Sequence, residues 1–333
     1  MSLQISLKRA TTSILKAIVS VAAASSLGPV FAQTYPDRPV TIVVGFAPGG
    51  AFDSVMRSLG EEMSKTLGQR VNVDNRPGAG GAIATQAVIA APADGHTLLA
   101  AGLQLGTGPH LNKVNYDPVA DLTMVGQIVS VPVFLLVRAD SPINDAKDLV
   151  TLSKKNGNGV SIGTGGVGTT GHFGALMIET AIKAPVVHVP FKGGAPGLLA
   201  LMAGEVDMMI DQPSGVLQGL MQSGKLRAVA VMQSARHPLT PNVKSAPEFG
   251  LTLETPLRGW QGLGVRTGTP PAVVKKLSAT LAAAAASPAF KKKMEQLDLE
   301  LVSTTSPEAF QKLYLDELAR WGAFIKKHKI TAQ

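Results

Sequence analysis

The chain has 333 residues, 45% hydrophobic and 16% charged, which is enough apolar side chain for two domains and too much for a disordered chain. The formal net charge is +8 and aromatic residues make up 5%; since the only basic run is Lys291-Lys292-Lys293, this balance argues against nucleic-acid binding and favours weak attraction for anionic solutes. The chain contains no cysteine, which excludes a disulfide scaffold, a thiolate nucleophile and a lipid anchor on an N-terminal cysteine.

The first 32 residues are typical of a secretory signal peptide. Lys8 and Arg9 form a basic start, residues 14–30 form a short apolar run, and small residues precede an expected cut after Ala32. The run is short for a bilayer span of about 20 residues, and no later segment is long and apolar enough to span. We therefore expect an exported, periplasmic protein without a membrane-inserted segment.

Strands and helices alternate along the first part of the mature chain. A β-branched run at residues 40–46 is typical of a strand buried on both faces, and Asp53 is well placed to cap the helix that follows. The predicted elements are strands over residues 40–46, 71–73 and 97–101 and helices over residues 54–67 and 82–91. This alternation predicts βαβ units.

The same alternation returns after residue 134, and a helical region ends the chain. The predicted helices span residues 144–155, 197–203 and 216–221, with another from about residue 170, and the predicted strands span residues 160–163, 186–191, 206–210 and 226–232. After residues 260–265 come terminal helices over residues 271–286, 288–297 and 307–327. Each terminal helix begins with proline in its first turn, where the missing N–H does no harm.

These elements predict an α/β fold of two lobes, each a central sheet flanked by helices, arranged as a clamshell. Lobe 1 is expected to comprise residues 34–133 and 256–333, and lobe 2 residues 134–255. The chain would cross between the lobes twice, with a hinge near residues 130–133 and 254–256.

The loop after the first strand, Phe46-Ala47-Pro48-Gly49-Gly50-Ala51-Phe52-Asp53, is a candidate anion site (the first loop). Ligands of open parallel sheets lie beyond the carboxyl ends of the strands. Paired glycines let backbone N–H groups face outward, and the next helix adds unpaired N–H groups and a positive dipole end. The alternative is a plain strand-to-helix turn in which Asp53 caps the helix.

A second glycine-rich loop, residues 163–172, contains Gly163-Thr-Gly165-Gly-Val-Gly168 between a strand and a helix (the second loop). The spacing matches a dinucleotide-binding fingerprint, but the strand at residues 186–191 ends without an acid for a ribose hydroxyl. The hydroxyls of Thr164, Thr169 and Thr170 suit a carboxylate instead. His172 follows in the first helical turn, where hydrogen bonding to a solute and a local structural role are both open.

Other strand ends carry further candidates. Gln104 follows one strand and could donate its amide to a solute, while Asp211 closes another and could accept from a solute amine or order the cleft wall. Lys192 is better interpreted as a solvated surface residue. Catalytic motifs such as G-x-S-x-G and H-E-x-x-H are missing from the sequence, and the six histidines lack metal-ligand spacing. We therefore predict no enzyme, metal or cofactor.

The motifs together resemble the Bug-type solute receptors of tripartite tricarboxylate transporters, over nearly the whole mature chain. The matching segments, in order, begin at Tyr35 (Tyr-Pro-Asp-Arg-Pro), Phe46, Asn75 (Asn-Arg-Pro-Gly-Ala-Gly-Gly), Ala93 (Ala-Asp-Gly-His-Thr), Gly163, Phe191 (Phe-Lys-Gly-Gly-Ala-Pro), Trp260 (Trp-Gln-Gly-Leu-Gly) and Gly268 (Gly-Thr-Pro). Each motif is weak by itself, but eight in this order are specific.

The resemblance implies a non-catalytic receptor with the two-lobed fold of periplasmic binding proteins (the Venus flytrap fold). Its two loops would hold a solute carboxylate through main-chain N–H groups and water. It implies contacts from Phe46, Ala47, Gly49, Gly50, Ala51, Asp53, Thr164, Gly165, Gly168, Thr169, Thr170 and His172. It also implies membrane transporter subunits as partners of what we expect to be a monomer. Thr169 and Thr170 stand where the family commonly has serine, so the choice among dicarboxylates, tricarboxylates, amino acids and aromatic acids stays open. An inorganic oxyanion receptor, a dinucleotide enzyme and a plain interaction protein remain alternatives.

Overall fold

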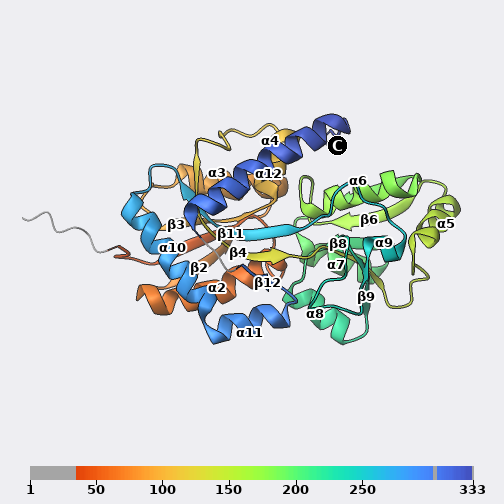
Figure 1. Ribbon diagram of the computed structural model, residues 1–333, viewed down its shortest axis with the longest axis horizontal. Helices are drawn as coiled ribbons and strands as arrows, with labels where there is room; N and C mark the ends of the chain where they lie inside the picture. Colours follow the sequence, from red (N-terminus) through yellow and green to blue (C-terminus); the bar gives the residue numbers. More distant parts are fainter. Residues whose placement is uncertain (1–34, 303–305, 332–333) are drawn as a thin grey trace, which may run out of the picture. The chain divides into compact units, whose positions relative to one another are not determined.

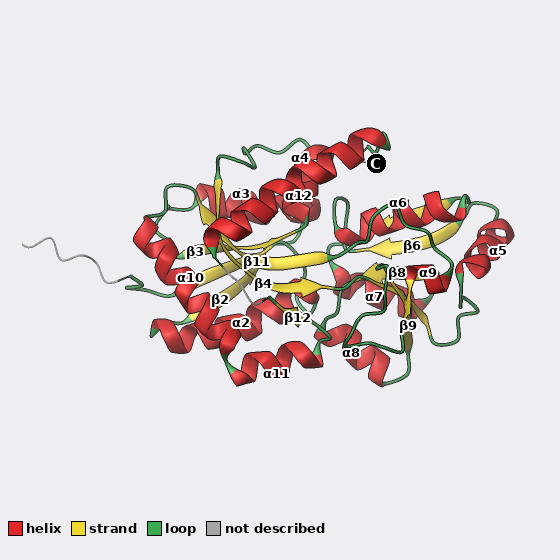
Figure 2. Ribbon diagram, viewed as in Figure 1, coloured by secondary structure: helices red, strands yellow, loops and turns green. Residues whose placement is uncertain are grey.

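The computed structural model describes residues 35–302 and 306–331, so the predicted signal peptide lies outside the described residues. Two six-stranded sheets organise this part of the chain, each with helices packed against it (Figures 1 and 2). The predicted two-lobed α/β fold is confirmed. No helix in residues 35–302 and 306–331 has both the length and the apolar character needed to cross a bilayer.

Lobe 1 is built on the first sheet. Its strands, in spatial order, are β12 (Glu300–Leu301), β4 (Leu122–Val131), β11 (Gly259–Arg266), β3 (Thr97–Gly102), β1 (Val40–Val44) and β2 (Val71–Asn75). Its helices are α2 (Ala51–Leu67), η1 (Ala79–Gly81), α3 (Ala82–Ala90), α4 (Gln104–Leu111), α10 (Pro271–Ala286), α11 (Pro288–Gln296) and α12 (Pro307–Lys327). β1 pairs with β2 and β3 in parallel, and β11 enters antiparallel between β3 and β4.

Lobe 2 is built on the second sheet and repeats this plan. Its strands, in spatial order, are β10 (Lys244–Ser245), β9 (Leu226–Val231), β5 (Phe134–Arg138), β8 (Met208–Asp211), β6 (Val160–Thr164) and β7 (Val186–Pro190). Its helices are α5 (Ala146–Asn156), α6 (Thr170–Ile182), α7 (Gly194–Ala203), α8 (Gly215–Gln222) and α9 (Ala246–Phe249). β6 pairs in parallel with both β7 and β8, so the carboxyl ends of these three strands meet at one edge.

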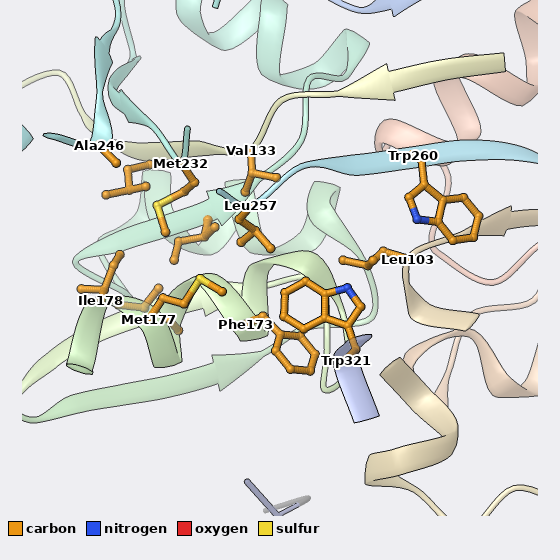
Figure 3. Close-up of a cluster of buried hydrophobic side chains, with 14 of the residues drawn as sticks. Leu103, Val133, Phe173, Met177, Ile178, Met232, Ala246, Leu257, Trp260 and Trp321 are labelled. Atoms are coloured by element: carbon orange, nitrogen blue, oxygen red, sulfur yellow. The ribbon is translucent and has the colours of Figure 1, made fainter. Parts of the chain in front are cut away.

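The chain passes from the first sheet to the second between β4 and β5 and returns before β11. The precise lobe boundaries and the hinge stay predictions. Helix α12 also contacts lobe 2, because the ring of Trp321 lies 4.6 Å from that of Phe173 on α6, centroid to centroid (Figure 3). Both rings are buried and belong to a continuous apolar cluster with members from both lobes.

Several elements differ from the sequence prediction at their N-terminal ends. Helix α2 begins at Ala51 and α7 at Gly194, each three residues before the predicted start at 54 and 197. The prediction that Asp53 is the N-cap of α2 is therefore wrong, since Gly50 holds that position. The earlier starts bring the first turns of both helices closer to the ends of the preceding strands.

Candidate functional site

A small cavity of about 40 Å³ lies where the carboxyl ends of strands from both lobes face each other. The first loop, the second loop, the start of α7 and the end of β8 all contribute to its wall. The lining residues are Phe46, Gly50, Ala51, Phe52, Gln104, Gly165, Thr169, Thr170, Gly171, Gly194, Ile210, Asp211 and Gln212. Its volume suits little more than one water molecule, so this structure represents a closed arrangement of the lobes.

Three helices begin at this cavity. Gly50 and Ala51 belong to the start of α2, Thr170 and Gly171 to the start of α6, and Gly194 to the start of α7. The first N–H groups of a helix have no partner within the helix, and each helix start carries about half a positive elementary charge. Because no lysine, arginine or histidine of the described residues lines the cavity, these backbone groups are its source of positive potential. Such an arrangement binds anions.

Charged side chains fix the first loop from behind. Asp53 is 5% exposed, and its Oδ2 accepts 2.9 Å hydrogen bonds from the backbone N–H of Gly49 and from Nε of Arg57. Arg57 also places Nη2 2.8 Å from Oδ1 of Asp53. Burial by itself would raise the pKa of Asp53, but the hydrogen bonds from Arg57, Gly49 and Asn75 outweigh it and lower that pKa. The carboxylate is thus turned away from the cavity and toward the loop backbone.

Asn75, at the end of β2, completes this support. Its Nδ2 donates to the carbonyl oxygen of Phe46 at 3.0 Å, and its Oδ1 accepts from Nη2 of Arg57 at 2.9 Å. Asn75 thereby joins the start of the first loop to the ion pair at its end. The sequence analysis included Asn75 only as part of a motif, and its position at a strand end beside β1 is the signal that could have found it.

The second loop is held by neutral groups. The hydroxyl of Thr164 lies 2.7 Å from Nε2 of His188 and accepts from the N–H of Gly166 at 3.3 Å. The hydroxyl of Thr169 donates to the carbonyl oxygen of Gly166 at 2.6 Å. These two hydroxyls, which the sequence suggested as solute donors, therefore have partners within lobe 2.

His172 also supports the second loop from below. Its Nδ1 accepts from the N–H of Gly168 at 3.2 Å, so this nitrogen carries no proton. Its ring is stacked on that of His188 with centroids 4.4 Å apart. Burial lowers the pKa of both rings to about 4, and for His172 the neighbouring His188 adds to the effect. Both histidines are consequently neutral at neutral pH.

Thr170 is the hydroxyl that the fold directs to the cavity. It lies in the first turn of α6, and its Oγ1 accepts from Nε2 of Gln212 at 3.0 Å. Gln212 in turn accepts at Oε1 from Nε2 of Gln261 at 3.3 Å, which links lobe 2 to β11 of lobe 1. Because Thr170 accepts in this network, its hydroxyl hydrogen remains available for a solute.

Asp211 is the single ionisable side chain among the described residues that line the cavity. Its Oδ2 is buried and has no hydrogen-bond partner within the described part of the chain. The carboxyl lies against Gly194, where an added Cβ would overlap Oδ2, so only glycine lets the start of α7 approach it this closely. Burial raises the pKa of Asp211 to about 7, opposed only in part by the N–H of Gln212.

Direct hydrogen bonds join the lobes around the cavity. The N–H of Ala47 donates to the carbonyl oxygen of Lys192 at 3.0 Å, and the N–H of Gly215 donates to Oγ of Ser54 at 3.1 Å. Thr107 of α4 donates to the carbonyl oxygen of Gly168. These bonds hold the two lobes together around the cavity.

The structure brings most of the predicted site residues to this one cavity. Those that line it are Phe46, Gly50, Ala51, Gln104, Gly165, Thr169, Thr170 and Asp211, and those that lie behind the lining are Ala47, Gly49, Asp53, Thr164, Gly168 and His172. Lys192 is exposed and lines a neighbouring cavity of about 260 Å³ instead. The lining residues that were not predicted as solute contacts are Phe52, Gly171, Gly194, Ile210 and Gln212. Gly194 and Gln212 both follow strand ends, which is the signal that could have identified them.

Comparison with known proteins agrees with this architecture. The family model described as "Tripartite tricarboxylate transporter family receptor" matches residues 55–330. The chain belongs to this receptor family. It is 33% identical over 301 residues to the "UPF0065 protein in tcbD-tcbE intergenic region" of Pseudomonas sp. (strain P51), covering 90% of this chain and 89% of that protein.

Two solved structures of high similarity carry informative names. The "periplasmic binding protein BugD" superposes with a TM-score of 0.84 at 36% identity, over 90% of this chain and all of that one (100%). MatC from Rhodopseudomonas palustris, solved with bound malate, superposes with a TM-score of 0.81 at 32% identity, over 87% and 99% of the two chains. The tripartite tricarboxylate transporter receptors are thus solute-binding proteins of the fold found here.

No group of three or more metal-ligating side chains gathers in residues 35–302 and 306–331. The polar groups that line the cavity belong to the helix starts, Thr169, Thr170, Gln104, Gln212 and Asp211. Hydrogen bonding is the chemistry that such groups offer.

Proposed function

We propose that this protein is a periplasmic receptor that captures a small organic carboxylate between its lobes and presents it to the membrane subunits of a tripartite tricarboxylate transporter. The observation that carries the proposal is the convergence of three helix starts on a cavity without a cationic side chain. Backbone N–H groups of this kind suit a carboxylate. The malate bound to MatC supports the same solute class.

The solute contacts proposed for lobe 1 come from the first loop and from Gln104, and those for lobe 2 come from the second loop, Thr170 and Asp211. Residues behind the lining, including Asp53 and His172, hold the loops in place. A carboxylate bound to both loops would favour the closed lobes and shift the population toward them. The hinge is proposed near residues 130–133 and 254–256. The closed surface would then be what the transporter recognises.

A thermal-shift screen of the mature protein, beginning at residue 33, tests this proposal. The panel contains monocarboxylates, dicarboxylates including malate, tricarboxylates, amino acids, aromatic acids, phosphate and NAD. A solute at 100 times its dissociation constant stabilises the folded state by about 2.7 kcal/mol. We expect one class of organic acid to raise the melting temperature. A response to phosphate or NAD without a response to any organic acid would contradict the proposal.

A matched pair of variants locates the binding. Thr170→Val removes a cavity hydroxyl from the start of α6, whereas Thr180→Val removes an exposed hydroxyl near the end of the same helix. We expect the first variant to reduce the thermal shift given by the acid and the second to leave it unchanged. Equal responses of the two variants would place the solute elsewhere.

A further inference from the structure

Asp211 is the ionisable group that the proposed function does not yet explain. It lies at the end of β8, lines the cavity, and has a buried Oδ2 without a hydrogen-bond partner within the described residues. A buried carboxylate oxygen without a partner is costly, and such a group reduces the cost by taking up a proton. In a binding site for anions, an ionised Asp211 would repel the solute.

Among the described residues that line the cavity with Asp211 there is no lysine, arginine or histidine to compensate its charge. Helix α7 contributes Gly194, α6 contributes Thr170 through Gln212, and Gln212, directly after β8, contributes its backbone N–H. The titratable groups on neighbouring elements are engaged elsewhere. His172 and His188 are stacked below the second loop, and Asp53 of α2 is paired with Arg57. The protonation of Asp211 therefore depends on burial and on what enters the cavity.

The total charge at the cavity determines whether Asp211 can stay ionised beside a bound solute. Three helix starts supply the equivalent of about one and a half positive charges. An ionised Asp211 would cancel much of that potential, and a dicarboxylate beside it would bring the local total to three negative charges. Two carboxylates that share one site do not both stay ionised against a low-dielectric wall, so one of them is protonated. Burial disfavours the ionised form of Asp211 and raises its pKa, so the proton goes to Asp211.

We propose that Asp211 binds the solute as a neutral carboxylic acid, so that wherever the empty site is ionised each solute anion enters together with one proton taken from solvent. The inference rests on the proposed carboxylate-receptor function. The protonated oxygen of Asp211 donates a hydrogen bond to an oxygen of the solute carboxylate. No covalent bond of the solute forms or breaks, and the proton returns to solvent on release. Asp211 would therefore select against solutes that place an uncharged group without a hydrogen-bond acceptor next to its protonated oxygen.

Titration calorimetry with malate tests this proton uptake. Measurements run from pH 6 to pH 9 in two buffers of different ionisation enthalpy, because the heat then reports how many protons are bound. We expect a nearly constant affinity below pH 7 and a loss of about tenfold per pH unit above it, with close to one proton bound per malate at the upper end. If malate gives no heat, the acid with the largest thermal shift in the panel replaces it.

Asp211→Asn supplies the matched variant, since asparagine keeps the shape and a donor hydrogen but cannot ionise. We expect it to bind the same acid with an affinity that does not vary with pH, and without proton uptake. The control is Asp316→Asn, which removes an exposed carboxyl from α12 that pairs only with Lys312, and it should behave as the natural sequence does. The uptake measured on the natural sequence does not depend on whether either variant folds.

The outcomes separate this inference from the proposed function. An acid that binds with pH-independent affinity and no proton uptake would overturn the role of Asp211 and leave the receptor intact. Tighter binding at high pH, confined to acids that carry an ammonium group, would show that Asp211 acts ionised as the partner of an amine, and would also overturn it. If no organic acid binds at any pH, the proposed function fails and the inference fails with it.

Discussion

The two loops that face each other across the cavity have the same place in their lobes but different supports. Each follows a parallel strand and leads into a helix whose first turn lines the cavity. The first loop is fixed by the ion pair of Asp53 with Arg57 and by Asn75. The second is fixed by threonine hydroxyls and two neutral histidines. Both loops thus present backbone N–H groups in the same way, but charged side chains support the first loop and neutral side chains support the second.

The difference means that acid should act on the two loops at different pH values. The folded pKa of Asp53 is lowered, so its support is fully present above its ordinary value of 3.8 and is lost only as pH falls below that value. The pKa of His172 and His188 is lowered from 6.5 to about 4. Unfolded histidine binds a proton below pH 6.5 while the folded rings do not, so their contribution declines as pH falls from 6.5 toward 4.

Removing the charged support should have the largest effect. Asp53→Ala leaves the N–H of Gly49 and the guanidinium of Arg57 without their acceptor at a nearly buried position. We expect a loss of about 2–3 kcal/mol in the free energy of unfolding, as for hydrogen bonds to charged groups, together with weaker solute binding. Urea unfolding measures the first quantity and calorimetry the second.

Asp74→Ala is the matched control for this variant, because Asp74 lies on the adjacent strand β2 and pairs with Arg76 on the surface, with the side chains 40% and 51% exposed. Exposed pairs of this kind contribute between about 0 and 1 kcal/mol. Asp53→Asn keeps an oxygen for Gly49 but loses the charge, and should fall between the two. If Asp53→Ala is no more destabilised than Asp74→Ala, the first loop does not depend on charge.

Mild acid should loosen the second loop before the first. Between pH 6.5 and 5 the two buried histidines oppose protonation, which costs up to about 1.4 kcal/mol of stability per pH unit for each ring. Hydrogen exchange of the backbone amides, followed from pH 7.5 to 5 and corrected for the intrinsic rate, should show falling protection in residues 164–172 and steady protection in residues 46–53. Equal changes in both loops would contradict the distinction drawn between them.

The variant His172→Asn sharpens this pH measurement, because the asparagine oxygen can accept from the N–H of Gly168 and does not titrate. We expect its unfolding free energy to decline less between pH 6.5 and 5 than that of the natural sequence. His188 would remain as the single titrating ring of the stacked pair. A decline of unchanged size would assign the acid sensitivity to groups outside the second loop.

The sequence predicted the two loops well because their signals are local. A β-branched run followed by paired glycines and a helix predicts both a strand end and an exposed backbone, and both loops line the cavity. The strand β4 was missed because glycine and polar residues such as Gln127 and Ser130 interrupt its apolar pattern, and the short apolar strand β5 that follows it was missed as well. Helix α4 was missed because it contains Pro109 and two glycines, so that tertiary packing rather than helix propensity determines it.

What the sequence could not supply was the direction of side chains and the order of strands. Asp53 and His172 were predicted to face a solute, but each turns toward its own loop backbone, and spacing along the chain does not distinguish these two directions. Gly194 and Asp211 come together because β7 and β8 both flank β6. The pairing of distant strands produces that contact, and no local pattern contains it.

A smaller effect should follow from the hydroxyl that the second loop offers to the solute. Thr170→Val keeps the side-chain shape but removes the donor and the partner of Gln212. We expect the affinity for the acid to fall about five- to tenfold, the equivalent of one hydrogen bond. Thr170→Ser, which restores the hydroxyl, should recover most of the affinity in calorimetry. A serine variant as weak as the valine variant would mean that the methyl group, not the hydroxyl, determines binding.

The smallest effect should come from a hydrogen bond that joins the two lobes and does not support either loop. Oγ of Ser54 accepts from the N–H of Gly215 on lobe 2 and also donates to the carbonyl oxygen of Gly50. Ser58 lies one turn later on α2, and its hydroxyl likewise donates to the carbonyl oxygen four residues earlier, that of Ser54. In the described residues it makes no hydrogen bond to Gly215. Ser54→Ala should therefore lower the affinity two- to fivefold, mainly through faster release, because it weakens the closed state by about 0.5–1 kcal/mol. Ser58→Ala should leave the release rate unchanged. Stopped-flow measurement of solute release from both variants checks this difference. Equal release rates would mean that the hydroxyl of Ser54, like that of Ser58, stabilises only helix α2 and not the closed state.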